Sequence, residues 1–207
     1  MTLSLANLPE EQRETTIEFA HYQMDDDAFY EFCQINEHLK LERNPDGSII
    51  AMPNTGGKTG NRNSAITYFL YGWTMQNSGL SFDSSTAFKF PNGATRSPDA
   101  AWISDARWNS LTEQQQEKFP PIAPDFVIEL IRSAARSATD QLPKAKEKML
   151  EYIDNGVLLG WLIDPKGEEV FIYRADGTIS KHTDFDQPLT GEATLPGFAF
   201  DLRLLRR

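Results

Sequence analysis

One short apolar run constrains the fold of this 207-residue chain more than any other segment. Residues 125–131 read Asp-Phe-Val-Ile-Glu-Leu-Ile, and a nearly continuous apolar run of this length predicts a central strand buried on both faces of its sheet. Glu129 is the exception within the run, because a carboxylate is expensive to bury without a charged partner. The run therefore predicts a covered sheet and marks Glu129 as a candidate functional residue.

The rest of the chain alternates between helical and strand patterns. Apolar side chains at spacings of 3 and 4 predict helices over 25–37, 61–76 and 139–155, with a short polar helix inside 105–124. Turn residues bound predicted strands at 39–43, 48–52, 81–84, 87–90, 98–104, 157–163, 169–173 and 178–182. This order predicts the α/β (α+β) class, with a lead-in over residues 1–24 and a single domain over 25–207.

The net charge limits the kind of partner the chain can have. Thirty acidic and 20 basic side chains leave a formal charge of −10, which argues against broad electrostatic adhesion to nucleic acid or to an anionic membrane. A local basic site is still allowed, because attraction to phosphate acts over about 10 Å at cellular salt. Basic residues gather in one stretch, at Arg132, Arg136, Lys144, Lys146 and Lys148.

The chain offers no sign of export, anchoring or a zinc site. Cys33 is the single cysteine, so no intrachain disulfide is expected, and the three scattered histidines lack zinc-ligand spacing. Apolar stretches are much shorter than the roughly 18 residues that a membrane span needs. We therefore expect a cytoplasmic protein with no membrane partner.

Two carboxylates suggest a divalent-cation site. Asp99 lies near the start of the strand predicted at 98–104, and Glu129 lies near the end of the strand predicted at 125–131. If the two strands pair antiparallel, both carboxylates converge at one end of the sheet. Mg²⁺ and Mn²⁺ prefer oxygen ligands, and Mg²⁺ needs only one or two protein carboxylates besides water and substrate phosphate. The alternative is structural: Asp99 follows a proline at a strand entry, and Glu129 lies at a sheet edge or pairs with Arg96 or Arg132.

A lysine on the next helix is placed to join these carboxylates. Lys148 stands one turn before Tyr152, at the margin of the apolar stripe of helix 139–155, where its stem can be buried and its ammonium presented at the end of the sheet. Such a lysine can position or help to deprotonate an attacking water and offset charge on a phosphoryl group.

Two other patterns carry less weight. The segment Thr55–Gly60 is similar to a phosphate-binding loop, but Met52 stands where that motif requires a glycine. We expect a flexible rim there, whose amides and Lys58 could contact a substrate phosphate. Three tryptophans read as core residues rather than as a base-stacking platform, namely Trp102, Trp108 and Trp161.

Three segments together carry a family resemblance. They begin at Arg96-Ser-Pro-Asp, at Pro124-Asp-Phe-Val-Ile-Glu and at Lys148-Met-Leu-Glu-Tyr, the last running on through Asn155-Gly-Val-Leu-Leu-Gly-Trp-Leu-Ile-Asp-Pro. The chain resembles the Uma-two family, a restriction-endonuclease-like group of the PD-(D/E)XK nuclease superfamily, over about residues 25–204. The resemblance implies a mixed central sheet flanked by helices, a divalent-metal site and phosphodiester hydrolysis.

Carried over by position, the resemblance makes Asp99 the first acidic residue of the site and Glu129 the second. The superfamily's lysine would stand two residues after Glu129, where this chain has Ile131. The basic role then falls to Lys148, or to Arg132, or the site is degenerate. Glu42, on the early hairpin, is a possible third metal ligand.

These observations predict an endonuclease that cleaves DNA with Mg²⁺ or Mn²⁺. The alternative is a catalytically degenerate nuclease fold that binds nucleic acid or a protein partner. We also expect a homodimer, because nucleases that cut both strands often match the two-fold symmetry of the duplex.

Overall fold

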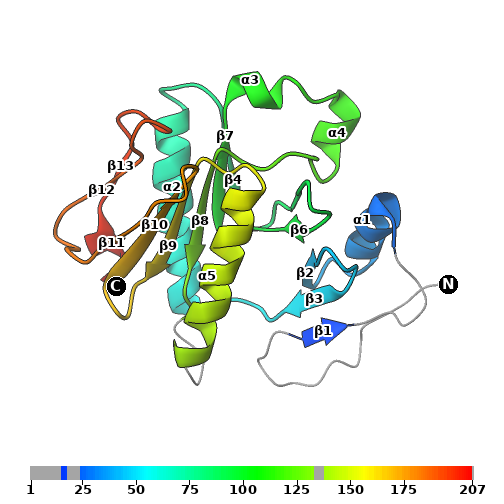
Figure 1. The fold of residues 1–207 in the computed structure, drawn as a ribbon, viewed down its shortest axis with the longest axis horizontal. Coiled ribbons are helices and arrows are strands. Elements are labelled where there is room, and N and C mark those ends of the chain that lie inside the picture. The colour runs from blue at the N-terminus through cyan, green and yellow to red at the C-terminus, as the bar shows by residue number, and fades with distance from the viewer. Residues whose placement is uncertain (1–14, 18–23, 133–137, 207) are drawn as a thin grey trace.

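A mixed six-stranded sheet forms the centre of the molecule (Figure 1). The structure is a computed structural model and describes residues 15–17, 24–132 and 138–206. The strand order is β11-β10-β9-β8-β7-β4, with β8 and β9 parallel and every other neighbouring pair antiparallel. The strands are β4 (Leu80–Asp83), β7 (Ala100–Ile103), β8 (Phe126–Leu130), β9 (Leu159–Asp164), β10 (Glu169–Arg174) and β11 (Ile179–His182).

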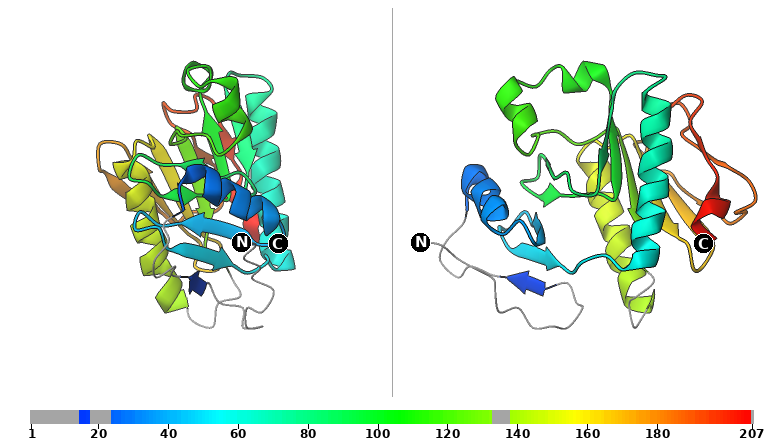
Figure 2. Two further views of the ribbon diagram at one scale, coloured as in Figure 1. Left: turned by 90° about the vertical axis from the view of Figure 1, so that its right-hand side faces the viewer. Right: turned by 180° about the vertical axis from the view of Figure 1, so that it is seen from behind.

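Two long helices cover the opposite faces of this sheet (Figure 2). Helix α2 (Gly57–Thr74) lies on one face, together with the C-terminal ribbon of β12 (Leu189–Thr190), β13 (Ala199–Phe200) and the 3₁₀ helix η1 (Leu202–Arg206). Helix α5 (Ala138–Asp154) packs on the other face against β9 and β10. The predicted class, a mixed sheet flanked by helices, is confirmed.

The apolar run of β8 is buried on both sides, as its sequence predicts. Phe126, Ile128 and Leu130 join the core on the α2 side, whereas Val127 joins the core on the α5 side. Because side chains alternate along a strand, Glu129 projects toward α5. The same alternation places Ile131 in the apolar core beneath α5.

A smaller five-stranded sheet stands beside the main one and carries its own core. Its order is β1-β3-β2-β6-β5, and helix α1 packs on it through Phe29 and Phe32. The predicted hairpin is confirmed, with Lys40 opposite Met52 in the antiparallel pair. The elements are β1 (Thr15–Ile17), α1 (Asp26–Ile35), β2 (Lys40–Arg43), β3 (Ile49–Met52), β5 (Phe88–Lys89) and β6 (Thr95–Arg96), and the short helices α3 (Asp105–Trp108) and α4 (Glu113–Glu117) follow β7.

Three local features differ from the predictions. Helix α2 begins at Gly57, so most of the flexible rim predicted over Thr55–Gly60 is its first turn; the glycines there leave no apolar spacing that would reveal the start of the helix. The strand predicted at 87–90 shrinks to β5 and pairs with β6, which is too short to show a pattern. Strand β1 lies inside the predicted lead-in, whose residues 1–14 and 18–23 are outside the described part.

Two further predictions can be compared with the structure. Trp102 and Trp161 are buried in the core, as predicted, and Trp108 packs against it partly buried. Within the described residues, no helix combines the length and the hydropathy that crossing a membrane requires.

The thiol of Cys33 on α1 provides a test of the small sheet's packing. Its side chain packs against the core beneath α1, and burial raises its pKa to about 12. Because the thiolate is the reactive form, we expect native protein at pH 8 to react with iodoacetamide far more slowly than protein unfolded in urea. Mass spectrometry of timed samples measures both rates; equal rates would show that α1 does not shield the thiol.

Candidate active site

Asp99 and Glu129 come together at one end of the main sheet, as the sequence predicts. Strands β7 and β8 pair antiparallel with Ala100 opposite Ile128, so the next step of the register sets Asp99 beside Glu129. The backbone N–H of Leu130 donates to Oδ2 of Asp99 at 2.8 Å. This bond fixes the Asp99 carboxylate across the end of β8.

Helix α2 supplies a second contact to Asp99. The side-chain amide of Asn63 donates to Oδ1 of Asp99 at 3.1 Å. The other end of the same amide, Oδ1 of Asn63, is buried and accepts no hydrogen bond from any residue that the structure describes. A buried polar atom of this kind is costly unless something binds it. Asn63 therefore adds, beside Asp99, an amide oxygen that is free to accept a hydrogen bond or to bind a cation.

Lys148 bridges two carboxylates that belong to different sheets. Its Nζ lies 2.9 Å from Oε1 of Glu129 on β8 and 2.9 Å from Oε1 of Glu42 on β2. Oε1 of Glu42 also accepts a hydrogen bond from the backbone N–H of Ser97 at 2.8 Å, and Nη1 of Arg96 lies 3.8 Å from its Oε2. The predicted position of Lys148 beside the strand carboxylate is thus observed.

Tyr152 completes the surroundings of Glu129. Its hydroxyl donates to Oε1 of Glu129 at 2.7 Å, from one helical turn after Lys148. Its ring packs in the core beside Phe90, with ring centroids 5.3 Å apart. The hydroxyl is therefore held by a buried ring and orients the Glu129 carboxylate.

The two glutamates that share Lys148 differ in their protonation equilibrium. Burial raises the pKa of Glu129, and the negative charges of Asp99 and Glu42 add to the effect. Burial also opposes ionisation of Glu42, but Lys148, Arg96 and Lys40 outweigh it and lower the pKa of that group. For Lys148, burial favours the neutral amine, but the charges of Glu129 and Glu42 prevail and raise its pKa. Lys148 is thus a fixed positive charge in this arrangement.

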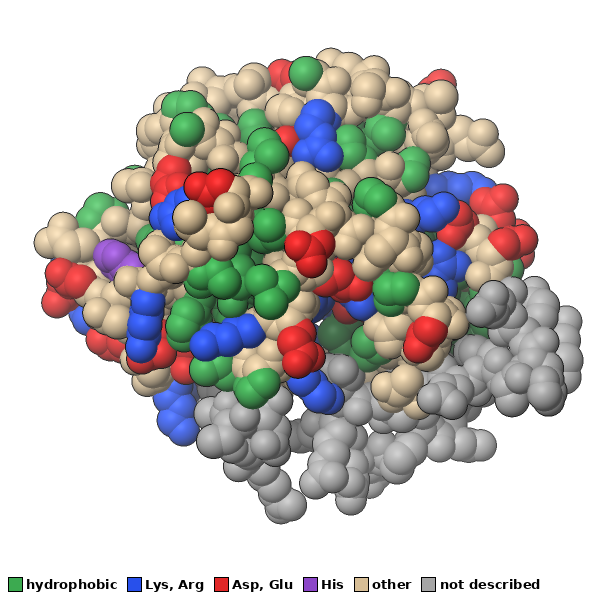
Figure 3. All heavy atoms as spheres, viewed as in Figure 1, with side chains coloured by type: hydrophobic (Ala, Val, Ile, Leu, Met, Phe, Trp, Pro, Cys, Tyr) green, Lys and Arg blue, Asp and Glu red, His purple; other side chains and the backbone are tan. Residues whose placement is uncertain are grey.

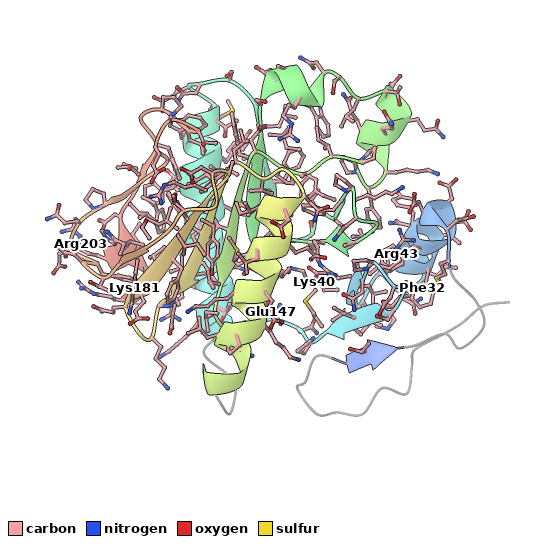
Figure 4. All side chains as sticks on the ribbon, in the orientation of Figure 1. Phe32, Lys40, Arg43, Glu147, Lys181 and Arg203 are labelled. Carbon is pink, nitrogen blue, oxygen red and sulfur yellow. The ribbon has the colours of Figure 1, made fainter. Side chains whose placement is uncertain are left out.

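Lys40 is a second cation near the site. It stands two residues before Glu42 on β2 and lies between the small sheet and α5 (Figure 4). Burial lowers the pKa of its ammonium, against the pull of Asp99, Glu129 and Glu42. Its charge therefore acts on all three carboxylates.

Neither arginine considered as a partner of Glu129 holds it. Arg96 pairs instead with Glu151 on α5, at 2.6 Å, and donates to the backbone carbonyl of Arg43. Arg132 donates to the carbonyl oxygen of Pro53 at 3.3 Å, so it does not take the basic role at the site. The prediction that Glu129 pairs with Arg96 or Arg132 is therefore wrong. Glu129 does have a charged partner, which is Lys148.

The basic stretch of the sequence does not form a patch at the site. Lys144 is exposed, and Lys146 lies over the ring of Phe171 at 4.0 Å from its centroid; Arg136 is outside the described residues. The face that carries α5 shows acidic and basic side chains interspersed (Figure 3). Of the described residues in that stretch, Lys148 alone contacts the carboxylates of the site.

Three residues of the site were missed in the sequence. Tyr152 could have been found, because it follows Lys148 by one helical turn and so shares its face. Lys40 precedes Glu42 by two positions and so points to the same side of β2. Asn63 gave no signal, because its role depends on how α2 lies against the end of β7.

The donor set suits a hard divalent cation. Among the described residues no group of three or more His, Cys, Asp or Glu is placed to hold a metal ion, and Glu42 is engaged by Lys148 and Arg96. Asp99 and Glu129 nevertheless offer carboxylate oxygens, and the buried Oδ1 of Asn63 offers an amide oxygen that has no donor. Mg²⁺ needs few protein ligands because it usually keeps several waters. The residues present therefore fit Mg²⁺ or Mn²⁺.

Comparison with known proteins agrees with this fold. The model of the Uma2 family, described as "Putative restriction endonuclease", matches residues 26–203. The chain belongs to this family.

A solved structure shares the fold. It is the crystal structure of a putative nuclease belonging to DUF820 from Anabaena variabilis, which is similar with a TM-score of 0.66 and 24% sequence identity. The match covers 80% of this chain and 89% of that one. No curated protein matches the sequence.

Removing the cation that bridges the two glutamates tests the network. Lys148→Met would leave the buried Glu42 and the partly buried Glu129 without their shared partner, so we expect the free energy of unfolding to fall by about 3–5 kcal/mol. Urea denaturation measures the change. Lys144→Met, at an exposed position of the same helix, is the control and should shift stability by no more than about 0.5 kcal/mol. Equal stability of the two variants would contradict the role of Lys148.

Proposed function

We propose that this protein is a metal-dependent nuclease that hydrolyses phosphodiester bonds in DNA. The observation that carries the proposal is the pair of carboxylates at the end of the sheet, Asp99 directly before β7 and Glu129 on β8, with Nζ of Lys148 at 2.9 Å from Oε1 of Glu129. Family membership and the fold support a nuclease. The metal and the DNA substrate are our inference from the chemistry of the side chains.

Each residue has a distinct task in this proposal. Asp99, Glu129 and the amide oxygen of Asn63 would hold Mg²⁺ or Mn²⁺, which when bound supplies Lewis acidity toward a phosphoryl oxygen and an activated water. Tyr152 keeps the Glu129 carboxylate oriented through its hydroxyl. Lys148, tied to Glu129, places a fixed positive charge where negative charge develops on phosphate.

Ile131 favours a second candidate, a degenerate nuclease fold that only binds its partner. The strand position at which the superfamily carries its lysine is apolar here and buried in the core. Lys148 restores a cation beside Glu129 from the neighbouring helix, which supports an intact site. Cleavage assays separate the two candidates.

Neutralising either carboxylate should strongly reduce the rate of DNA cleavage. We expect wild-type protein to nick or cut DNA in Mg²⁺ or Mn²⁺ and not in EDTA, and Asp99→Asn and Glu129→Gln to lower the rate by at least about a hundredfold. Gel analysis of labelled DNA measures the rates. Asp105→Asn, at an exposed residue of α3, should cut normally. Activity that persists in Asp99→Asn would argue against this site, and no cleavage by wild type under any of these conditions would favour the binding module.

The role of Asn63 can be tested without turnover. Asn63→Ala removes both the donor to Asp99 and the free oxygen, so Mn²⁺ should bind about 10–100-fold more weakly. Electron paramagnetic resonance of free Mn²⁺ measures the affinity. Ser64→Ala, at the next and exposed position of α2, should bind as wild type; unchanged Mn²⁺ binding in Asn63→Ala would remove Asn63 from the site.

The homodimer and the cytoplasmic location remain predictions. Light scattering of the purified chain tests the first, and fractionation of the source cell tests the second.

A further inference from the structure

A groove runs along helix α2 away from the candidate active site. Its volume is about 490 Å³, and Asn63, the residue bonded to Asp99, forms part of its wall. Most of the lining comes from one face of α2, and the rest comes from Thr55 and the end of β4. The lining residues are Thr55, Gly60, Asn63, Ser64, Thr67, Tyr68, Tyr71, Asp83 and Ser84.

Two exposed tyrosine rings form the aromatic part of the groove's lining. The side chains of Tyr68 and Tyr71 are 71% and 55% exposed, which is unusual for rings on a helix that packs against a sheet. At 1.5 Å per residue, they stand about 8 and 12 Å along the helix from Asn63. Both rings can therefore be reached by a chain that passes through the site at Asp99.

The lining of the groove suits flat neutral groups better than phosphates. No lysine or arginine is among its described lining residues, and the single charged one, Asp83, is an acid. The carboxylate of Asp83 already accepts from the backbone and hydroxyl of Ser85. The remaining wall consists of hydroxyls, an amide and the two rings, which suits stacking and hydrogen bonding to uncharged rings.

We propose that this groove binds unpaired nucleobases of the strand that enters the active site, stacked on Tyr68 and Tyr71. The proposal rests on the nuclease function above and names its substrate class, single-stranded or locally unpaired DNA. Bases inside a duplex are stacked on one another and cannot reach the rings without being extruded. The net charge of −10 also disfavours a duplex that would be held by its phosphate backbone alone.

A second copy of the chain fits this face less well. The large apolar side chains exposed on α2 and directly after it are Tyr68, Phe69, Tyr71 and Met75, and the polar side chains of Ser64 and Thr67 lie beside them in the groove wall. Stable protein interfaces bury about 800 Å² on each partner around an apolar centre. Continuity with Asp99 through Asn63 favours a substrate strand.

Base-dependent binding is the direct test. A labelled 20-residue oligo-dT and an abasic strand of equal length are titrated with wild type in Ca²⁺, which replaces Mg²⁺ so that binding is measured without cleavage. We expect wild type to bind the dT strand more tightly than the abasic one. Tyr68→Leu and Tyr71→Leu should each weaken dT binding about tenfold and leave the abasic strand unchanged.

Matched variants keep the result specific to the rings. Tyr68→Phe and Tyr71→Phe retain the stacking surface and should bind dT as wild type does. Ile179→Ala, at a 51% exposed position on β11, should also bind normally. A dT strand that carries 5-iodouracil should crosslink to Tyr68 or Tyr71 on irradiation, as located by mass spectrometry.

Several outcomes would overturn the proposal. The first is that wild type binds the dT strand and the abasic strand equally well. The second is that the leucine variants bind the dT strand as wild type does. The third is that the leucine substitutions convert a dimer into a monomer in light scattering, which would show that this face is an interface between two copies.

The two proposals fail separately. Ring-dependent dT binding without cleavage in Mg²⁺ or Mn²⁺ would leave the base subsite and reject the nuclease. DNA cleavage that is unchanged in Tyr68→Leu and Tyr71→Leu would support the nuclease function and reject the base-binding groove.

Discussion

The partly buried Lys148 links the molecule's three main parts through its ammonium. It extends from α5 and contacts Glu129 of the main sheet and Glu42 of the small sheet, each at 2.9 Å. Arg96 repeats the connection one step away, because it binds Glu151 of α5 from strand β6 of the small sheet. Charges in such positions are costly unless each has a partner, so the sheets and α5 are constrained to one relative position. The site exists only where these parts meet.

Much of the fold could be predicted because its strongest patterns are local. The apolar run of β8, the hairpin of β2 and β3, and the stripe of α5 each reflect burial along a single element. Predictions were weaker where partners decide the structure. Strand β6 has two residues and exists because β2 and β5 flank it, and the glycine-rich start of α2 has no apolar spacing to reveal a helix.

The site divides in the same way. Asp99 and Glu129 could be placed together because antiparallel pairing of two recognisable strands brings a start beside an end. Lys148 followed from its place at the edge of a helical stripe. Asn63 could not be predicted, since its contact with Asp99 depends on the angle at which α2 crosses the end of the sheet. The ion pair of Glu42 with Lys148 could not be predicted for a related reason, since how closely the small sheet approaches α5 does not follow from the sequence of either segment.

Ile131 separates this chain from the linear acid–lysine spacing that the family resemblance implies. Ile131 is part of the apolar core under α5, and the cation beside Glu129 is Lys148, 19 positions later in the chain. A search for a fixed spacing between acid and lysine would discard this sequence as inactive. Recognition of such folds therefore has to compare which groups meet in space, since a linear signature records only one of the routes by which they can meet.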